Sequence, residues 1–157
     1  MSVAFRREGD DEHLEPKFEL PIPPGPNRVT ARGLALTRTK VEGLEAAVAA
    51  ETDEEPRKKL QRDLRYWRTR LATAELMPVP DGHVVAFGTR VTYRLNGQDK
   101  RIAIVGDDEA DPAEGRIAFS APLARAMMDV EVHESVDFVG RDGAIEILAI
   151  EPIAKGE

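Results

Sequence analysis

Two apolar seams separated by a short break constrain the fold of this chain more than any other feature. The first seam repeats at steps of three and four residues, and the second repeats the same steps after the break. The members of the two seams are Leu34, Thr37, Val41, Leu44 and Val48, then Leu60, Leu64, Trp67, Leu71 and Ala74. A period of 3.5 residues keeps such side chains on one side of a helix, so two successive seams predict an antiparallel two-helix coiled coil.

Helix-end signals define the limits of this hairpin. The Thr30 hydroxyl can cap the first helix, and Pro56 is tolerated only in the first turn of the second helix. The connecting turn is therefore predicted at residues 51–55, and Pro78 and Pro80 end the second helix. The hairpin should span residues 28–78, with arms of about 22 residues that each extend about 33 Å at 1.5 Å per residue.

The apolar period changes to two from Val84 onward. Apolar and polar residues alternate around positions 91–95, 102–104, 136–138 and 145–147. Asn96-Gly97 is a strong signal for a two-residue hairpin turn, and residues 122–128 predict one short helix opened by a Ser120 cap. We therefore predict an α+β chain in which residues 79–157 form a small antiparallel sheet with one short helix.

Composition bounds the remaining possibilities. Residues 1–27 contain five prolines between Pro16 and Pro26, and few apolar residues, which predicts a flexible or extended leader. Residues 81–157 carry 8 basic and 15 acidic side chains, a net charge of −7, whereas residues 1–80 are neutral. The acidic half should repel nucleic-acid phosphates, so it either fits a basic protein surface as partner or is a solvated surface that keeps the protein in solution. The chain has no cysteine and no apolar run long enough to cross a membrane, so we expect a cytoplasmic protein without disulfides.

The predicted turn and the start of the second helix are strongly charged. The acidic tip consists of Glu51, Asp53, Glu54 and Glu55. Such carboxylates either stabilise the helix N-terminus, by about 0.3–1 kcal/mol each, or serve as metal ligands. The basic run that follows either is a solvated face or contacts RNA phosphates, with Arg57, Lys58 and Arg62 as the candidates; its other members are Lys59, Arg65, Arg68 and Arg70.

Three short motifs stand out along the chain. The first is Val-Thr-Ala-Arg-Gly-Leu at 29–34, and the second is Phe-Gly-Thr-Arg-Val at 87–91. The third and most specific is the pair Ile-Val-Gly-Asp-Asp-Glu-Ala-Asp-Pro at 104–112 and Phe-Ser-Ala-Pro-Leu-Ala-Arg-Ala-Met-Met at 119–128. Together they resemble the bacterial GreA/GreB transcript-cleavage factors over about residues 27–151, where the first motif is similar to the Thr-x-x-Gly opening of the family's coiled coil and the second to its entry into the sheet.

The resemblance implies an FKBP-like fold for residues 79–157 and a regulator that binds bacterial RNA polymerase. The coiled coil would enter the secondary channel, where tip acids share a Mg²⁺ ion with the polymerase and stimulate its cleavage of backtracked RNA, near the nascent 3′ end. The factor would be a monomer with no catalytic residue and no metal of its own. The implied polymerase contacts are Asp107, Asp108, Glu109, Asp111, Pro112, Ser120, Pro122, Leu123 and Arg125.

The chain also departs from the family pattern, and the departures leave alternatives open. The family's Gly-Asp-Leu-Ser-Glu-Asn type of tip loop is absent, and each arm is shorter by about three turns. Short-armed relatives of the type called regulator of nucleoside diphosphate kinase (Rnk) bind the polymerase without stimulating cleavage. Two further hypotheses are an FKBP-like prolyl isomerase, which the scarcity of aromatic residues disfavours, and a coiled-coil adaptor unrelated to transcription.

Overall fold

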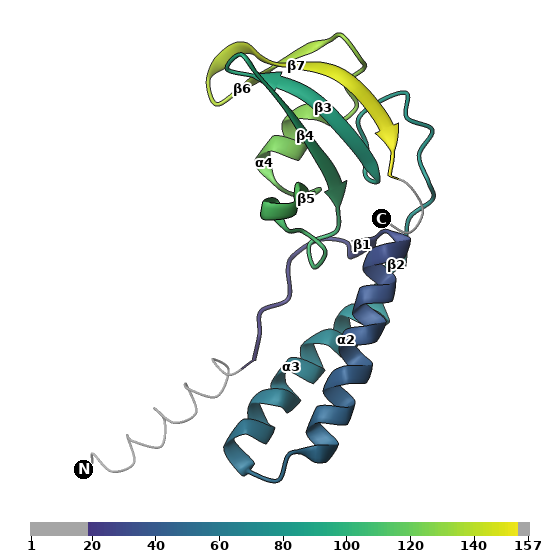
Figure 1. The fold of residues 1–157 in the computed structure, drawn as a ribbon, viewed down its shortest axis with the longest axis vertical. Coiled ribbons are helices and arrows are strands. Elements are labelled where there is room, and N and C mark those ends of the chain that lie inside the picture. The colour runs from purple at the N-terminus through teal and green to yellow at the C-terminus, as the bar shows by residue number, and fades with distance from the viewer. Residues whose placement is uncertain (1–18, 154–157) are drawn as a thin grey trace, which may run out of the picture. The chain divides into compact units, whose positions relative to one another are not determined.

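A computed structural model describes residues 19–153, which form two compact units (Figure 1). The first unit contains the described residues up to Gly25 together with Thr37–Thr73, and the second contains Pro26–Leu36 and the chain from Ala74 onward. Most of the predicted leader lies outside the described residues, and its described part, residues 19–27, contains no helix or strand. None of the described helices has the length and apolar character that a membrane span needs.

The first unit is built on the predicted helical hairpin. Helix α2 spans Ala31–Ala50, and helix α3 spans Glu54–Thr73, so each arm has 20 residues and a length of about 30 Å. The Thr30 hydroxyl caps α2 by accepting a hydrogen bond from the Gly33 N–H at 3.0 Å, and Pro56 lies in the first turn of α3, both as predicted. Seam residues are buried or half-buried along both helices, which confirms the period of 3.5.

Short strands flank the two helices of the hairpin. Strand β1, Arg28–Val29, pairs in parallel with strand β2, Glu75–Leu76. Helix α3 ends at Thr73, before the limit that Pro78 set in the prediction, because the backbone that follows bonds to β1, as in Met77 N–H to Val29 O at 3.0 Å. Both strands and the first turn of α2 belong to the second unit.

The second unit contains a five-stranded sheet in the order β5-β4-β3-β7-β6. Its strands are β3 Thr89–Leu95, β4 Gln98–Val105, β5 Arg116–Ala118, β6 Ser135–Phe138 and β7 Arg141–Pro152. The Asn96-Gly97 turn joins β3 to β4 with φ values of 55° and 75°, as the sequence predicted for a type I′ turn.

The predicted antiparallel sheet needs one correction, because β4 and β5 are parallel. The connection between them contains a 3₁₀ turn, η2 (Pro112–Glu114), and returns the chain to Ala103, so that β5 runs in the same direction beside the last three residues of β4. Strand β5 has only three residues, too few to show an alternating pattern. The α+β fold class is confirmed, with a mixed sheet.

Helix α4, Pro122–Met127, packs on the sheet and closes the core. Its Ala124 and Met127 are fully buried with the alternating residues of the strands, which are Val91, Tyr93, Ile102, Ile104, Ile145 and Ile147. The predicted Ser120 cap was wrong: Ala121 occupies the N-cap position and makes no side-chain cap bond. The Ser120 hydroxyl instead donates to Asp107 Oδ1 at 2.8 Å.

Asp129 and His133 have left-handed backbone conformations in the loop between α4 and β6. Asp129 follows α4 with φ of 69°, and His133 precedes β6 with φ of 75°. The Asp129 N–H donates to Val85 O at 2.8 Å, and the His133 N–H donates to Ile147 O at 2.7 Å. Asp and His tolerate this region of φ better than most residue types, and the two hydrogen bonds hold the loop in place.

Candidate functional site

The turn between α2 and α3 carries the four predicted tip carboxylates. Asp53, Glu54 and Glu55 are exposed, and Glu51 is half-buried. Glu51 Oε2 accepts a hydrogen bond from the Asp53 N–H at 3.1 Å, and the Asp53 carbonyl accepts one from the Arg57 N–H at 3.1 Å. These two bonds fix the backbone of the turn and start α3, so the acidic side chains project from an ordered loop.

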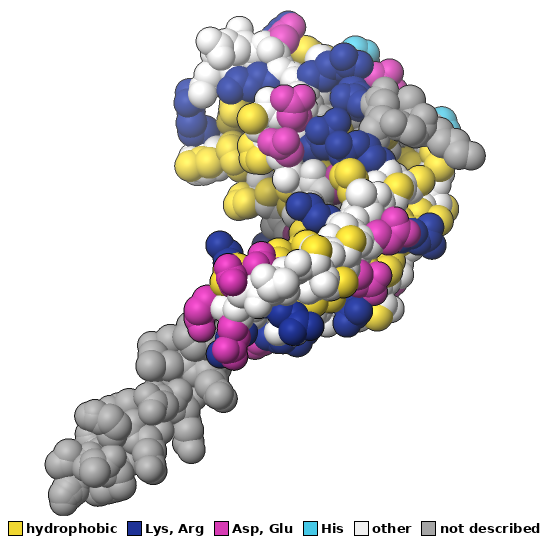
Figure 2. All heavy atoms as spheres, turned by 60° about the horizontal axis from the view of Figure 1, so that its bottom comes forward, with side chains coloured by type: hydrophobic (Ala, Val, Ile, Leu, Met, Phe, Trp, Pro, Cys, Tyr) yellow, Lys and Arg dark blue, Asp and Glu magenta, His cyan; other side chains and the backbone are white. Residues whose placement is uncertain are grey.

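The carboxylates of the tip differ in how far local partners neutralise them. Lys58 Nζ lies 3.6 Å from Glu54 Oε2 and 3.9 Å from Glu55 Oε2. Within residues 19–153, the Asp53 carboxylate has no hydrogen bond or ion pair. Figure 2 shows acidic side chains gathered at the end of the hairpin, with basic ones beside them. The tip thus presents one uncommitted carboxylate next to two weakly paired ones.

The tip does not form a complete metal site by itself. The described residues contain no group of three or more acidic or histidine side chains that could hold a metal ion. Mg²⁺ in proteins is often held by only one or two carboxylates, with other ligands from water and phosphate. Asp53 and Glu54 fit that smaller role, provided that a partner supplies the rest of the coordination sphere.

The basic run along α3 is largely paired with acids. Arg62 donates to Asp63 Oδ1 from Nε and Nη2, at 3.3 and 3.1 Å, and Arg68 Nη2 lies 2.9 Å from Glu45 Oε2 on α2. Arg70 is only 2% exposed, so the solvated face ends before it. Among the predicted RNA contacts, Lys58 and Arg62 have these acidic neighbours, and Arg57 is exposed without an ion pair in the described part of the chain.

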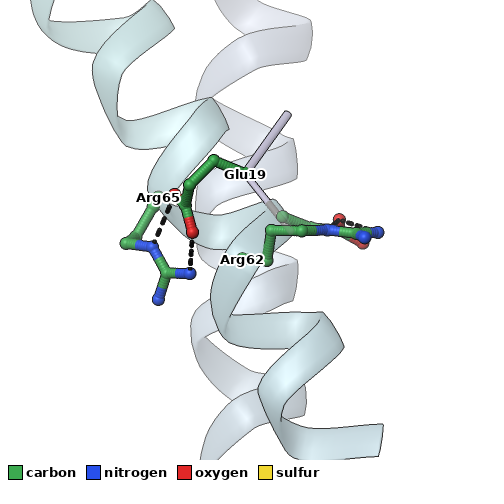
Figure 3. A network of polar contacts seen from close by, with 4 residues as sticks. Glu19, Arg62 and Arg65 are labelled. Carbon is green, nitrogen blue, oxygen red and sulfur yellow. Dashed lines mark hydrogen bonds and ion pairs between the residues drawn. The ribbon is translucent and has the colours of Figure 1, made fainter. Parts of the chain in front are cut away.

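Arg65 has a partner from outside the hairpin. Its Nε donates to Glu19 Oε1 at 3.0 Å, and its Nη2 donates to Glu19 Oε2 at 2.5 Å. Figure 3 shows the two side chains face to face, with Arg62 directed away from them. The hydrogen bonds from Arg65 lower the pKa of Glu19 below its ordinary value, and the same bonds raise the pKa of Arg65. Both groups are exposed, so solvent screens this interaction strongly.

The acidic turn after β4 is a different kind of site, because its central carboxylate is buried. The Glu109 side chain is 4% exposed. Glu109 Oε1 accepts a hydrogen bond from Thr30 Oγ1 at 2.6 Å, and Oε2 accepts one from Arg32 Nη1 at 3.0 Å. The carboxylate also lies at the N-terminus of α2, where the helix dipole favours negative charge. We call Glu109, Thr30 and Arg32 the clamp.

Two glycines leave the space that the close contacts around the clamp need. A Cβ on Gly33 would lie 2.8 Å from Glu109 Oε1, and a Cβ on Gly106 would lie 2.3 Å from the Arg28 carbonyl oxygen. Arg28 in turn places its guanidinium 5.3 Å from the centre of the Phe119 ring. The motifs around Thr30, Gly106 and Phe119 are distant in the sequence, but they contact one another inside the second unit.

The remaining predicted docking residues lie on the surface near this assembly. Asp111, Pro112, Ser120, Pro122 and Arg125 are exposed, Asp107 and Asp108 are half-exposed, and Asp107 accepts the bond from Ser120. Leu123 is half-buried and packs against the core. Glu109, Asp107 and Leu123 are engaged within the fold. The other predicted contacts form a candidate docking surface, called the docking surface below, which consists of Asp108, Asp111, Pro112, Ser120, Pro122 and Arg125.

Two features of these sites carried no recognisable sequence signal. Glu109 and Thr30 are 79 residues apart, and Glu19 and Arg65 are 46 residues apart, so no local pattern links the partners. The Thr-x-x-Gly motif could be recognised in the sequence, but its contact with the carboxylate of Glu109 could not be predicted from it. Only the packing of the chain brings these groups together.

Sequence comparisons relate the second unit to known proteins. Residues 80–152 match the family described as "Transcription elongation factor, GreA/GreB, C-term". The transcription elongation factor GreA of Sinorhizobium medicae is 38% identical over 87 residues, which cover 52% of this chain and 55% of the relative. The GreA of Caulobacter sp. strain K31 is 41% identical over 88 residues, which cover 52% of this chain and 56% of the relative.

The match has a limited extent. The chain spans about half the length of the curated relatives it matches. A crystal structure of GreA factor homolog 1 (Gfh1) from Thermus thermophilus is 14% identical, with 81% of this chain and 99% of that chain covered, and its TM-score of 0.37 is too low to support an argument. The family match covers the five-stranded sheet and the short helix α4, so residues 80–152 carry a domain of the GreA/GreB C-terminal type.

Proposed function

We propose that this protein is a transcription elongation regulator that binds bacterial RNA polymerase and acts through its secondary channel. The observation that carries the proposal is the combination of a GreA/GreB C-terminal domain with a helical hairpin whose turn presents exposed carboxylates. The matched relatives are themselves named transcription elongation factors. The factor acts as a cytoplasmic monomer and modulates the polymerase's own activity without being an enzyme.

The docking surface supports a protein partner with positive charge. It joins the acids Asp108 and Asp111 to the exposed prolines Pro112 and Pro122, and Arg125 adds one cation at its edge. Prolines present apolar area at low entropic cost, and acids at an interface increase the rate of association with a basic surface. We propose that this surface holds the factor on the polymerase.

The finer proposal concerns the tip. Asp53, with Glu54 beside it, would supply a carboxylate ligand to a Mg²⁺ ion of the polymerase, and that ion would supply the Lewis-acid chemistry for hydrolysis of backtracked RNA near its 3′ end. Two metal ions about 4 Å apart can activate a water and stabilise the leaving oxygen, so a single added carboxylate can be enough to change the activity of such a centre. Arg57 is the best placed of the basic candidates for a contact with the RNA.

The second candidate function is a channel occupant of the Rnk type that does not stimulate cleavage. Two observations favour it: the arms have only 20 residues, and Lys58 neutralises part of the tip charge. In this case the factor would change pausing or initiation by obstructing the channel, and the tip acids would only stabilise α3.

Transcript cleavage by stalled, backtracked polymerase complexes separates the two candidates. The variant Asp53→Asn/Glu54→Gln removes both tip charges, and Glu42→Gln is the control for a charge change elsewhere on the hairpin. Cleavage that wild type and Glu42→Gln stimulate, and the tip variant does not, supports the finer proposal. Equal results for all three proteins, with binding intact, support the channel occupant. No competition with a GreA factor for the polymerase would refute both.

A further inference from the structure

The face of the sheet that points away from α4 carries a cluster of arginines. The strand registers place Glu151, Arg90, Ala103 and Arg116 in one row, on β7, β3, β4 and β5 in turn. The residues that follow Arg90, Ala103 and Arg116 along their strands pack in the core with α4, so the row points to the opposite face. Arg101 lies two residues before Ala103 and shares this face. We call Arg90, Arg101 and Arg116 the arginine patch.

Positive charge exceeds negative charge within this row and the arginine patch. Arg101 Nη2 donates to Glu151 Oε1 at 2.8 Å, and this bond crosses β3, the strand that carries Arg90. Glu151 is the one acid of the row, and Arg116 has no ion pair or side-chain hydrogen bond within residues 19–153. Three positive charges therefore lie beside one negative charge, in a part of the chain, residues 81–157, whose net charge is −7. Neighbouring guanidiniums repel one another, so an added anion would stabilise the patch.

The face that carries the patch is open to solvent. Ala149 is exposed although its strand, β7, lies inside the sheet between β3 and β6. A small side chain on an inner strand is exposed only where no other layer covers the face. Ala103 is 2% exposed between Arg90 and Arg116, whose long stems can cover so small a side chain. Arg101 is exposed and Arg116 is half-exposed, so another molecule can reach both guanidiniums.

The surroundings of the patch favour an acidic protein segment over a nucleic acid. Arg94, farther along β3, lies 2.8 Å from Asp99 and 3.7 Å from Glu146, so the positive charge does not continue along the face. A phosphate backbone needs a continuous basic groove, whereas two or three carboxylates need only the patch itself. Strands β3, β4, β5 and β7 also place no aromatic side chain on this face, and the bases of a single strand bind by stacking on such rings.

We propose that the arginine patch is a docking surface for an acidic segment of a partner protein. Each guanidinium can donate two parallel N–H bonds to one carboxylate. Arg90 and Arg116 lie two strands apart, about 10 Å at the usual strand spacing, so two carboxylates of one segment can bind at the same time. The patch shares no residue with the docking surface described above, and the inference does not depend on the proposed function.

Binding of a labelled octaglutamate peptide to the purified full chain tests the patch without polymerase. Fluorescence anisotropy at low salt compares wild type with Arg116→Gln and with Arg38→Gln, the matched control, which changes an exposed arginine of α2 outside the patch. We expect Arg116→Gln to weaken binding about five-fold, because one charge-assisted contact is lost, and Arg38→Gln to weaken it by less than about two-fold.

A second pair of variants changes peptide binding in the opposite direction. Glu151→Gln frees Arg101 from its carboxylate, and we expect it to tighten peptide binding about three-fold. Glu131→Gln removes the same charge from an exposed position between α4 and β6 and should have a clearly smaller effect.

Four results would each overturn the proposal. They are no peptide binding by wild type, equal losses for the two arginine variants, equal gains for the two glutamate variants, and tighter binding of a single-stranded oligonucleotide with the same number of charges. Failure of the proposed function would appear separately, as a lack of polymerase binding by wild type, and would leave the peptide measurements unaffected.

Discussion

Glu109 and Asp53 are both acidic residues next to a helix N-terminus, but they differ in burial and in hydrogen bonding. Glu109 is buried, and both of its oxygens accept hydrogen bonds from Thr30 and Arg32. Asp53 is exposed, and its carboxylate is unpaired within the described residues. A carboxylate whose bonding capacity is used inside the fold contributes to stability, whereas one that keeps its capacity is available for a partner. Sequence motifs alone do not separate these two roles.

The largest expected effect tests whether the clamp region is as closely packed as the geometry indicates. Gly106→Ala places a methyl group 2.3 Å from the Arg28 carbonyl oxygen, and the backbone on both sides must move. We expect the free energy of unfolding to fall by about 3 kcal/mol, the upper range for overpacking. Urea denaturation followed by circular dichroism measures the change.

Gly43→Ala is the matched control for this substitution. Gly43 lies within α2, and a Cβ there would meet no atom within 4 Å. Alanine favours a helix over glycine, so we expect the free energy of unfolding to rise by about 1 kcal/mol. Equal effects of the two substitutions would mean that Gly106 is not tightly enclosed, and the contrast between the two regions would weaken.

The next effect concerns the buried carboxylate itself. Glu109→Ala leaves the Thr30 hydroxyl and the Arg32 guanidinium without their acceptor and removes a charge that suits the N-terminus of α2. We expect a loss of about 2 kcal/mol, because a buried hydrogen-bonded charge is removed while its partners remain. Thermal unfolding with Asp111→Asn as an exposed control provides the measurement, and a loss no greater than that of the control would refute a structural role for Glu109.

The sequence predictions were correct where local residues determine the structure, and incomplete where distant segments determine it. The hairpin, the Thr30 cap and the Asn96-Gly97 turn were predicted correctly, since a period or a pair of neighbouring residues determines each of them. The turn predicted at residues 51–55 is shorter, at 51–53, because α3 begins at Glu54, two residues before Pro56. The strands β1, β2 and β5 were not predicted, because each has only two or three residues and pairs with a segment distant in the sequence.

The candidate site shows this limit most clearly. The sequence identified Glu109 as part of a family motif but assigned it to the polymerase surface with its neighbours. Its burial depends on the packing of the turn at 106–111 against Arg28 to Gly33, which no local pattern reports. The prediction of a Ser120 cap was wrong for a similar reason. Ser120 lies next to the start of α4, but its hydroxyl donates a hydrogen bond to Asp107, which is distant from α4 in the sequence.

A smaller effect on stability is expected at Val139, an exposed residue that affects the fold through its backbone conformation and not through side-chain packing. Val139 is 79% exposed and has φ of 51° in the turn between β6 and β7, a conformation that is strained for a β-branched residue. Val139→Asn creates an Asn-Gly turn, and we expect it to stabilise the domain by about 1 kcal/mol. The melting temperature is the measurement, and Asn96→Val, the reverse change in the other hairpin turn, should lower it.

The smallest expected effect on stability belongs to Asp53, and it completes the comparison with Glu109. Asn serves as a helix N-cap as well as Asp does, so Asp53→Asn should change the free energy of unfolding by less than about 0.5 kcal/mol. Any effect of this variant on polymerase then has to come from the missing charge, since the fold is unchanged. Measuring stability and transcript cleavage on the same preparation makes that distinction. A stability loss comparable to that of Glu109→Ala would place Asp53 among the structural carboxylates and remove the main support for a metal-directing tip.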